Sequence, residues 1–169
     1  MPEKYRPVPV SETDERFMRR ALELAAEAAE AGEVPVGCVI ERGGEIIAEG
    51  RNRRETERNA LAHAELEAIG EACRELGGWR LTGCVLYVTL EPCPMCAGAI
   101  VNARIPKVVY GTKDAKAGAM GSVLNMGSYP LNHRAAVEAG LLGEECAGVL
   151  RAFFAERRRR GSGAQPPDD

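Results

Sequence analysis

The sequence predicts an α/β domain in which helices cover both faces of one mixed β-sheet, a three-layer α/β/α arrangement. Short apolar runs of strand length alternate with stretches of helical periodicity, and a glycine pair separates the first two apolar runs. A hairpin followed by helix, strand, helix and strand is typical of such a domain. Because crossovers between parallel strands are right-handed, we expect both crossover helices to begin at the same edge of the sheet.

Residues 11–31 are expected to form the first helix, because their apolar side chains recur at helical spacing. Ser11 and Thr13 are candidate N-caps, since a side-chain oxygen there can accept a hydrogen bond from a free N–H of the first turn. Gly32 can end the helix in a left-handed conformation. One face of this helix should therefore be buried against the sheet.

A β-hairpin is expected next, with strands at residues 36–40 and 46–48. Gly43 and Gly44 lie between them, and paired glycines supply the positive φ angles that a tight hairpin turn requires. Helical periodicity then returns over residues 62–76 and ends near a second glycine pair. The chain thus passes from a hairpin into its first crossover helix.

The second half continues the alternation of strand and helix. We predict a buried strand, a helix, a strand, a long irregular segment and a last helix at residues 84–90, 94–103, 107–111, 112–134 and 144–160. Long irregular segments in compact domains often carry function. The irregular segment is therefore a candidate for substrate contacts.

The length of 169 residues suits a single domain, with 45% hydrophobic and 28% charged residues. We expect an irregular N-terminal segment over residues 1–12, one domain over 13–160 and a disordered tail over 161–169. No apolar run approaches the roughly 20 residues of a membrane span, so we expect a cytoplasmic protein without membrane contact. We expect no disulfide framework from the six cysteines, because the chain is neither short nor evidently secreted.

A formal net charge of -3 argues against general nucleic-acid affinity, but the charge is uneven. Residues 151–160 hold five arginines and one glutamate, and residues 101–116 hold four basic residues and one aspartate. Such stretches can give an acidic protein a basic face for phosphates. They can equally be solvated helix surface, and charge alone does not separate the two readings.

Two short clusters carry the chemistry: His63-Ala64-Glu65 and Pro92-Cys93-Pro94-Met95-Cys96, with 29 residues between His63 and Cys93. Each alone is weak evidence. Together, in this order, H-x-E and P-C-x-x-C are the signature of zinc nucleobase deaminases.

Two thiolates and one imidazole would give Zn²⁺ three protein ligands, here Cys93, Cys96 and His63. A fourth position then stays open for water, which is the mark of a catalytic site. Zinc lowers the pKa of its water toward about 7, so hydroxide becomes available at neutral pH. Glu65 is expected to take the water proton and return it to the ring nitrogen and the leaving ammonia. We expect one Zn²⁺ per chain.

Two other kinds of site could contain these clusters, a structural zinc site and a redox-active cysteine pair. A structural zinc site needs a fourth protein ligand, and His133 and the other cysteines are not paired at finger-like spacing. A redox pair at Cys93 and Cys96 would leave His63 and Glu65 without a role. Catalytic zinc accounts for all four residues.

Over about residues 15–160 the chain resembles the bacterial tRNA-specific adenosine deaminases, which convert the wobble adenosine of an anticodon to inosine. The resemblance rests on residues 33–37, 62–65, 89–100, 103–105, 110–111, 114–119, 121–122 and 132–134, with Asn52 and residues 153–158. It implies a five-stranded sheet of the cytidine deaminase type. The cluster around the cysteines is shared with guanine deaminases, whereas the stretches after residue 110 favour the tRNA enzymes.

The resemblance also implies roles for further residues. Asn52 would hydrogen-bond the flipped adenine, the backbone N–H of Ala64 would help to orient it, and Asp114 would accept a hydrogen bond from a ribose 2′-OH. Contacts with the RNA would come from Phe153, Phe154, Arg157 and Arg158. Each also has a plain structural reading, as a turn residue, a core residue or a helix end.

The partners that the resemblance implies are a tRNA, through the anticodon stem-loop of tRNA-Arg, and a second copy of the chain in a homodimer. The alternative function is deamination of guanine or another small nucleobase. A zinc-stabilised RNA-binding module without enzymatic activity is a third hypothesis.

Overall fold

One five-stranded mixed sheet runs through the protein, in a computed structural model that describes residues 14–161. The strand order is β2-β1-β3-β4-β5. Strand β1 pairs antiparallel with β2 and with β3, whereas β3, β4 and β5 are parallel. The strands are β1 Gly37–Arg42, β2 Glu45–Arg51, β3 Cys84–Leu90, β4 Lys107–Thr112 and β5 Ala136–Ala139.

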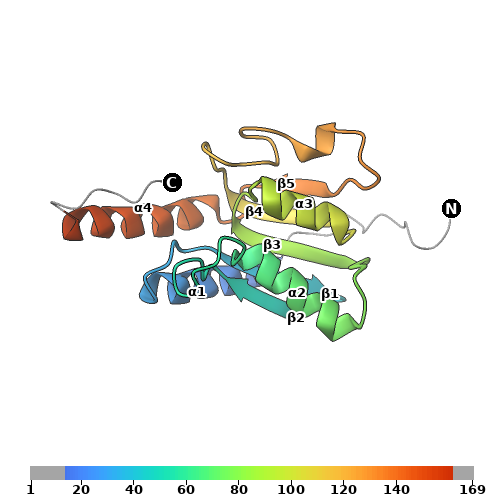
Figure 1. Cartoon of the computed structure of the whole chain (residues 1–169), viewed down its shortest axis with the longest axis horizontal. Helices are drawn as coiled ribbons and strands as arrows, with labels where there is room; N and C mark the ends of the chain where they lie inside the picture. Colours follow the sequence, from blue (N-terminus) through green and yellow to red (C-terminus); the bar gives the residue numbers. More distant parts are fainter. Residues whose placement is uncertain (1–13, 162–169) are drawn as a thin grey trace.

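Four helices cover the two faces of this sheet (Figure 1). They are α1 Glu15–Glu30, α2 Ala64–Leu76, α3 Pro94–Asn102 and α4 Gly143–Arg160. Buried side chains of α1 and the start of α4 pack with one face, and those of α2 and α3 with the other. The three-layer arrangement predicted from the sequence is confirmed. No helix within residues 14–161 is long and apolar enough to cross a membrane.

The first helix begins later than predicted, at Glu15 rather than at residue 11. Its N-cap is Asp14, whose side chain accepts a hydrogen bond from the backbone N–H of Arg16. A carboxylate at this position satisfies a free N–H and also faces the positive end of the helix dipole. The candidate caps Ser11 and Thr13 lie outside the described residues, as do residues 1–12 and most of the predicted tail.

The hairpin turn forms at Gly43 and Gly44, as predicted, with φ angles of 62° and 88°. Strand β2 extends beyond its apolar run at both ends, and β1 extends beyond its run at the C-terminal end, because polar residues there join the ladder. Two other glycines allow close helix packing on these strands. A Cβ at Gly37 would overlap the carbonyl oxygen of Ala21 in α1, and one at Gly50 would overlap that of Ala64 in α2.

The segment between β4 and β5 is largely irregular, as predicted, with one short 3₁₀ helix at Met126–Ser128. Strand β5 itself was not located from the sequence, where only four strand segments stand out. It has four residues, three of them exposed, and it pairs with β4 at an edge of the sheet. A short exposed strand of this kind lacks the apolar run that marks the buried ones.

The crossover helices begin at one edge of the sheet, as the handedness rule requires. Helix α2 joins β2 to β3, and α3 joins β3 to β4. His63 is the N-cap residue of α2 and Cys93 is the N-cap residue of α3. Thus the two sequence clusters meet where the two helices start.

Candidate metal centre

The side chains of His63, Cys93 and Cys96 converge on a common point. Their ligand atoms all lie within 4.8 Å of one another. The Nδ1 atom of His63 is 3.7 Å from the sulfur of Cys93 and 3.6 Å from that of Cys96. Within residues 14–161 this is the only group of three or more His, Cys, Asp or Glu side chains so placed.

Local backbone structure explains this convergence. His63 and Cys93 both have extended N-cap conformations, which turn their side chains toward the open ends of the helices. Pro94 occupies the first turn of α3, where its missing N–H costs nothing. Cys96 lies one helical turn after Cys93 and is buried. The free N–H groups and the dipoles of both helices favour negative charge on the thiols.

The protonation of the three side chains is linked. A hydrogen bond from the Cys96 thiol lowers the pKa of Cys93 to about 4, and the same bond raises the pKa of Cys96. The hydrogen bond with Cys93 raises the pKa of His63. These three side chains therefore compete for protons, and a bound divalent cation would displace those protons.

The donor set fits zinc. Two sulfurs and one imidazole nitrogen are typical zinc ligands, and three protein ligands leave the fourth tetrahedral position open. All six cysteines are free, and Cys38, Cys84 and Cys146 are buried as apolar side chains. None of those three belongs to the metal group, which excludes a Cys₄ structural site within the described residues.

Glu65 lies in the first turn of α2 and is only 4% exposed. Burial raises its pKa to about 7, against the opposing effects of a hydrogen bond from its own backbone N–H, of the charge on His63 and of a hydrogen bond with Cys96. The carboxyl group is thus next to the metal group and shielded from bulk water. Its position suits proton transfer with a molecule held beside the metal.

The side chains of Asn52 and Asp114 both hydrogen-bond to backbone groups. The amide of Asn52 donates to the carbonyl of Val34 at 3.2 Å and accepts from the N–H of Arg54 at 3.0 Å. Asp114 accepts from the backbone N–H groups of Lys116 and Ala117 at 3.0 and 3.1 Å. An amide group can make further hydrogen bonds as donor and as acceptor, so Asn52 can still bind a substrate group.

Ala64 is the first residue of α2 and is fully buried. Its N–H belongs to the first turn of the helix, next to His63. The other predicted contacts, Phe153, Phe154, Arg157 and Arg158, lie on α4, which does not carry the metal group. The two phenylalanine rings meet edge to face, and Arg157 lies over Phe153.

Two buried carboxylates near the site were missed by sequence reasoning. Glu33 follows α1 and Glu91 follows β3, and both accept hydrogen bonds from backbone N–H groups of nearby loops. Burial would raise the pKa of Glu91, but hydrogen bonds from Ser122, Met120 and Asp114 outweigh it and lower that pKa. Their partners are mostly backbone N–H groups, which leave no signature in the sequence.

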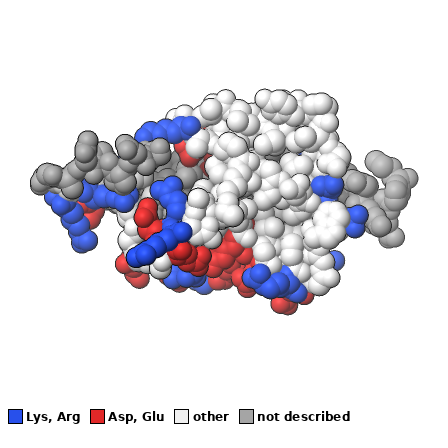
Figure 2. Space-filling view, viewed as in Figure 1, with Lys and Arg blue, Asp and Glu red and all other residues white. Residues whose placement is uncertain are grey.

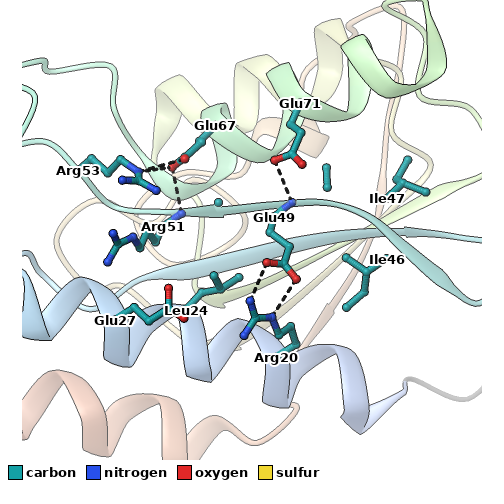
Figure 3. A pocket seen from close by; sticks show the side chains of 12 residues that line it. Arg20, Leu24, Glu27, Ile46, Ile47, Glu49, Arg51, Arg53, Glu67 and Glu71 are labelled. Carbon is teal, nitrogen blue, oxygen red and sulfur yellow. Dashed lines mark hydrogen bonds and ion pairs between the residues drawn. The ribbon is translucent and has the colours of Figure 1, made fainter.

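A cavity of about 410 Å³ lies elsewhere, between α1, β2 and α2 (Figure 3). Glu67 and Glu71 of α2 accept the outward N–H groups of Arg51 and Glu49, and Glu49 pairs with Arg20 of α1 at 2.8 Å. None of the metal group lines this cavity. The side chains cover the open edge of β2, a common protection against unwanted strand pairing.

Comparisons with known proteins agree with this site. The family model for the cytidine and deoxycytidylate deaminase zinc-binding region matches residues 11–112. The chain is 52% identical over 153 residues to the tRNA-specific adenosine deaminase of Bacillus subtilis, covering 90% of this chain and 95% of that one.

Two solved structures share the fold. One comes from work on A-to-I editing by tRNA:A34 deaminases at the wobble position of transfer RNA, with a TM-score of 0.79 and 44% identity. It covers 81% of this chain and all of that one. The other is a guanine deaminase from Nitrosomonas europaea, with a TM-score of 0.72 and 28% identity over 86% of this chain and 87% of that one.

Proposed function

This chain belongs to the cytidine and deoxycytidylate deaminase zinc-binding family and, within it, to the tRNA-specific adenosine deaminases; on that premise we propose that it deaminates the wobble adenosine of a tRNA anticodon. One adenosine and one water give one inosine and one ammonia. The observation that carries the proposal is the convergence of His63, Cys93 and Cys96 beside the buried Glu65.

The residues divide the work between binding and proton transfer. His63, Cys93 and Cys96 would hold zinc, which when bound supplies the Lewis acidity that makes water a nucleophile near neutral pH. Glu65 accepts a proton from the attacking water and delivers protons to the ring nitrogen and the leaving amine of adenine. The buried position of Glu65 keeps this transfer apart from bulk solvent.

The substrate side of the site lies on the loops next to the metal group. Asn52 and the N–H of Ala64 hydrogen-bond the flipped base, and Asp114 accepts a hydrogen bond from a ribose 2′-OH. A 2′-OH is what distinguishes RNA from DNA at a given position. Phe153, Phe154, Arg157 and Arg158 extend the contact along the RNA through aromatic stacking and phosphate binding.

The expected substrate is the anticodon stem-loop of tRNA-Arg, and the expected location is the cytoplasm. Deamination of free guanine is the less favoured of the two functions. The relatives named for tRNA deamination are 44–52% identical to this chain, whereas the guanine deaminase is 28% identical. The buried Glu65 argues against a binding module without activity, since zinc binding alone does not need it.

The experiment is sequencing of tRNA-Arg before and after incubation with the protein. We expect inosine at the wobble adenosine and no ammonia from free guanine or cytidine. Ammonia from guanine with unchanged tRNA would support the small-molecule alternative. No product from either, in a protein that holds zinc, would support the binding module.

We propose that an uncharged face of the protein binds a second copy of the chain. Helix α3 and residues 117–133 contain no Lys, Arg, Asp or Glu. Figure 2 shows a broad area without charged side chains in this part of the molecule. Val123, Tyr129 and Leu131 are exposed within residues 117–133. A homodimer through this face would cover them and place the interface next to Cys93.

Leu131→Glu tests this interface against Ile46→Glu, which introduces the same charge at an exposed apolar residue of β2. Sedimentation should show a dimer for the wild type and for Ile46→Glu, and a monomer for Leu131→Glu. A dimeric Leu131→Glu variant would contradict the assignment of the face, and a monomeric wild type would contradict the dimer.

A further inference from the structure

We propose that Glu33 and Glu91 are positioning residues that fix the two loops bordering the metal group and thereby set the affinity for the substrate. The loops are residues 52–62, here the histidine loop, and residues 113–122, here the cysteine loop. The substrate side of the inference rests on the proposed function. The anchoring of each loop is independent of it.

Glu91 ties the cysteine loop to the end of β3. Its side chain is 2% exposed and accepts from the backbone N–H groups of Asp114 at 3.2 Å, Met120 at 3.0 Å and Ser122 at 3.2 Å. It also accepts from the hydroxyl of Ser122. A Cβ at Gly118 would overlap this carboxylate, so the loop wraps closely around it.

The anchored loop is hydrogen-bonded to the residue that precedes Cys93. The N–H of Ala119 donates to the carbonyl of Pro92 at 2.9 Å, and Pro92 precedes Cys93. Asp114, the proposed ribose contact, begins the same loop and donates its own N–H to Glu91. The position of Asp114 relative to Cys93 therefore depends on Glu91.

Glu33 does the same for the histidine loop. It is 1% exposed and accepts from the N–H of Glu55 at 3.1 Å, the N–H of Thr56 at 2.7 Å and the Thr56 hydroxyl at 3.0 Å. This loop begins at Asn52, the proposed base contact, and leads into His63. Most of its side chains are exposed, so the sheet and helices provide little packing to hold it.

The chemistry explains why a carboxylate occupies both positions. A buried charge is costly unless hydrogen bonds compensate it, and here backbone N–H groups do so. A carboxylate only accepts, and both oxygens of each side chain face donors. Glutamine would turn an NH₂ toward a backbone N–H and leave that donor without a partner.

The metal ligands depend less on these anchors. His63 and Cys93 are helix N-caps, and Cys96 is within α3. The helices are fixed by the apolar packing of α2 and α3 on the sheet. Loss of one anchor should therefore loosen one loop while zinc binding persists. The expected kinetic effect is a raised KM with little change in kcat, because substrate contacts move and the reacting groups do not.

The test compares Glu91→Gln and Glu33→Gln, each serving as the control for the other, with Glu57→Gln as an exposed control in the histidine loop. Hydrogen exchange should rise in residues 113–122 for Glu91→Gln and in residues 52–62 for Glu33→Gln. Neither effect needs a substrate, so this arm stands even if the tRNA assignment fails. Exchange that rises in neither loop, or equally in both, would overturn the anchoring.

Kinetics on the zinc-loaded enzyme form the second arm. KM for the anticodon stem-loop should rise on the order of 10- to 100-fold, the range expected for misplaced binding groups. Zinc content and kcat should stay within about threefold of the wild type. Unchanged KM in both variants, or loss of zinc together with kcat, would overturn the positioning role.

Should either glutamine variant fail to fold, Ser122→Ala and Thr56→Val remove one hydroxyl donor from each anchor while keeping the carboxylate. The same pattern of exchange, restricted to the loop that carries the substitution, is then expected at smaller amplitude. Its absence in both would count against the proposal.

Discussion

At the scale of single residues, two neighbouring positions at the start of α2 have different chemical roles. His63 lies just outside the helix, in extended conformation, and turns its Nδ1 toward the cysteines. Glu65 lies within the first turn and is buried. The first can serve as a ligand while the second remains available for protons. Spacing of one residue between ligand and acid is enough to separate the roles.

The ligand assignment predicts that His63→Ala and Cys93→Ala each lose zinc. Either change leaves two protein ligands, and a two-ligand site binds the metal weakly. Metal analysis of purified protein should give about one zinc per chain for the wild type and for Cys73→Ala, a cysteine outside the group. Full occupancy in the His63 or Cys93 variant would reject the assignment.

The ligand types and the acid could be predicted from the sequence because few residue types bind zinc and their spacing is short. Glu33 and Glu91 could not be predicted in this way. Their partners are backbone N–H groups between 22 and 31 residues away in the chain. A backbone donor has no sequence signature, so such anchors emerge only once the loops are placed in space.

At the scale of elements, helix starts and close packing determine the site. The helices that carry His63 and Cys93 begin at the same sheet edge, and Gly50 lets α2 approach β2 at the turn that follows His63. Periodicity and glycine signals predicted most of these elements. Strand β5 was not predicted, because its exposed residues form no apolar run. The start of α1 was predicted too early, because several polar residues there could cap a helix.

Gly50→Ala should destabilise the fold by about 1–3 kcal/mol or more, because the added methyl group would overlap the carbonyl oxygen of Ala64. Gly70→Ala is the matched control within α2. Its Cβ would meet only the end of the Arg74 side chain at 3.6 Å, and alanine favours a helix by up to about 1 kcal/mol over glycine. Urea unfolding distinguishes them, and equal stability of the two variants would contradict the packing.

At the scale of the whole molecule, charge is segregated while the net charge stays small. The last part of α4 projects beyond the sheet and carries consecutive arginines, Arg157 to Arg160 (Figures 1 and 2). An uncharged area lies over α3 and residues 117–133. Net charge alone conceals both features. Their arrangement suits one surface for RNA and another for a second copy of the chain.

Removal of Arg157 and Arg158 should weaken tRNA binding and reduce its salt dependence. Each lost phosphate contact should lower the slope of log K against log salt by roughly 0.7 to 0.9. Alanine at Arg74 and Arg80 removes the same charge from two exposed positions, one in the last turn of α2 and one in the loop that follows it, and should leave the slope unchanged. Identical slopes for both double variants would indicate that the arginines of α4 are solvated helix surface and do not contact phosphates.

Single-turnover deamination of the tRNA-Arg anticodon stem-loop by Glu65→Gln tests most directly that the metal group and this acid form one catalytic site. The variant should retain about one zinc per chain and bind the RNA, yet form inosine at least roughly 10² to 10⁴ times more slowly, the range for lost acid–base catalysis. Glu75→Gln, at an exposed glutamate near the end of α2, should keep near-normal rates. Near-normal inosine formation by zinc-loaded Glu65→Gln would contradict the account.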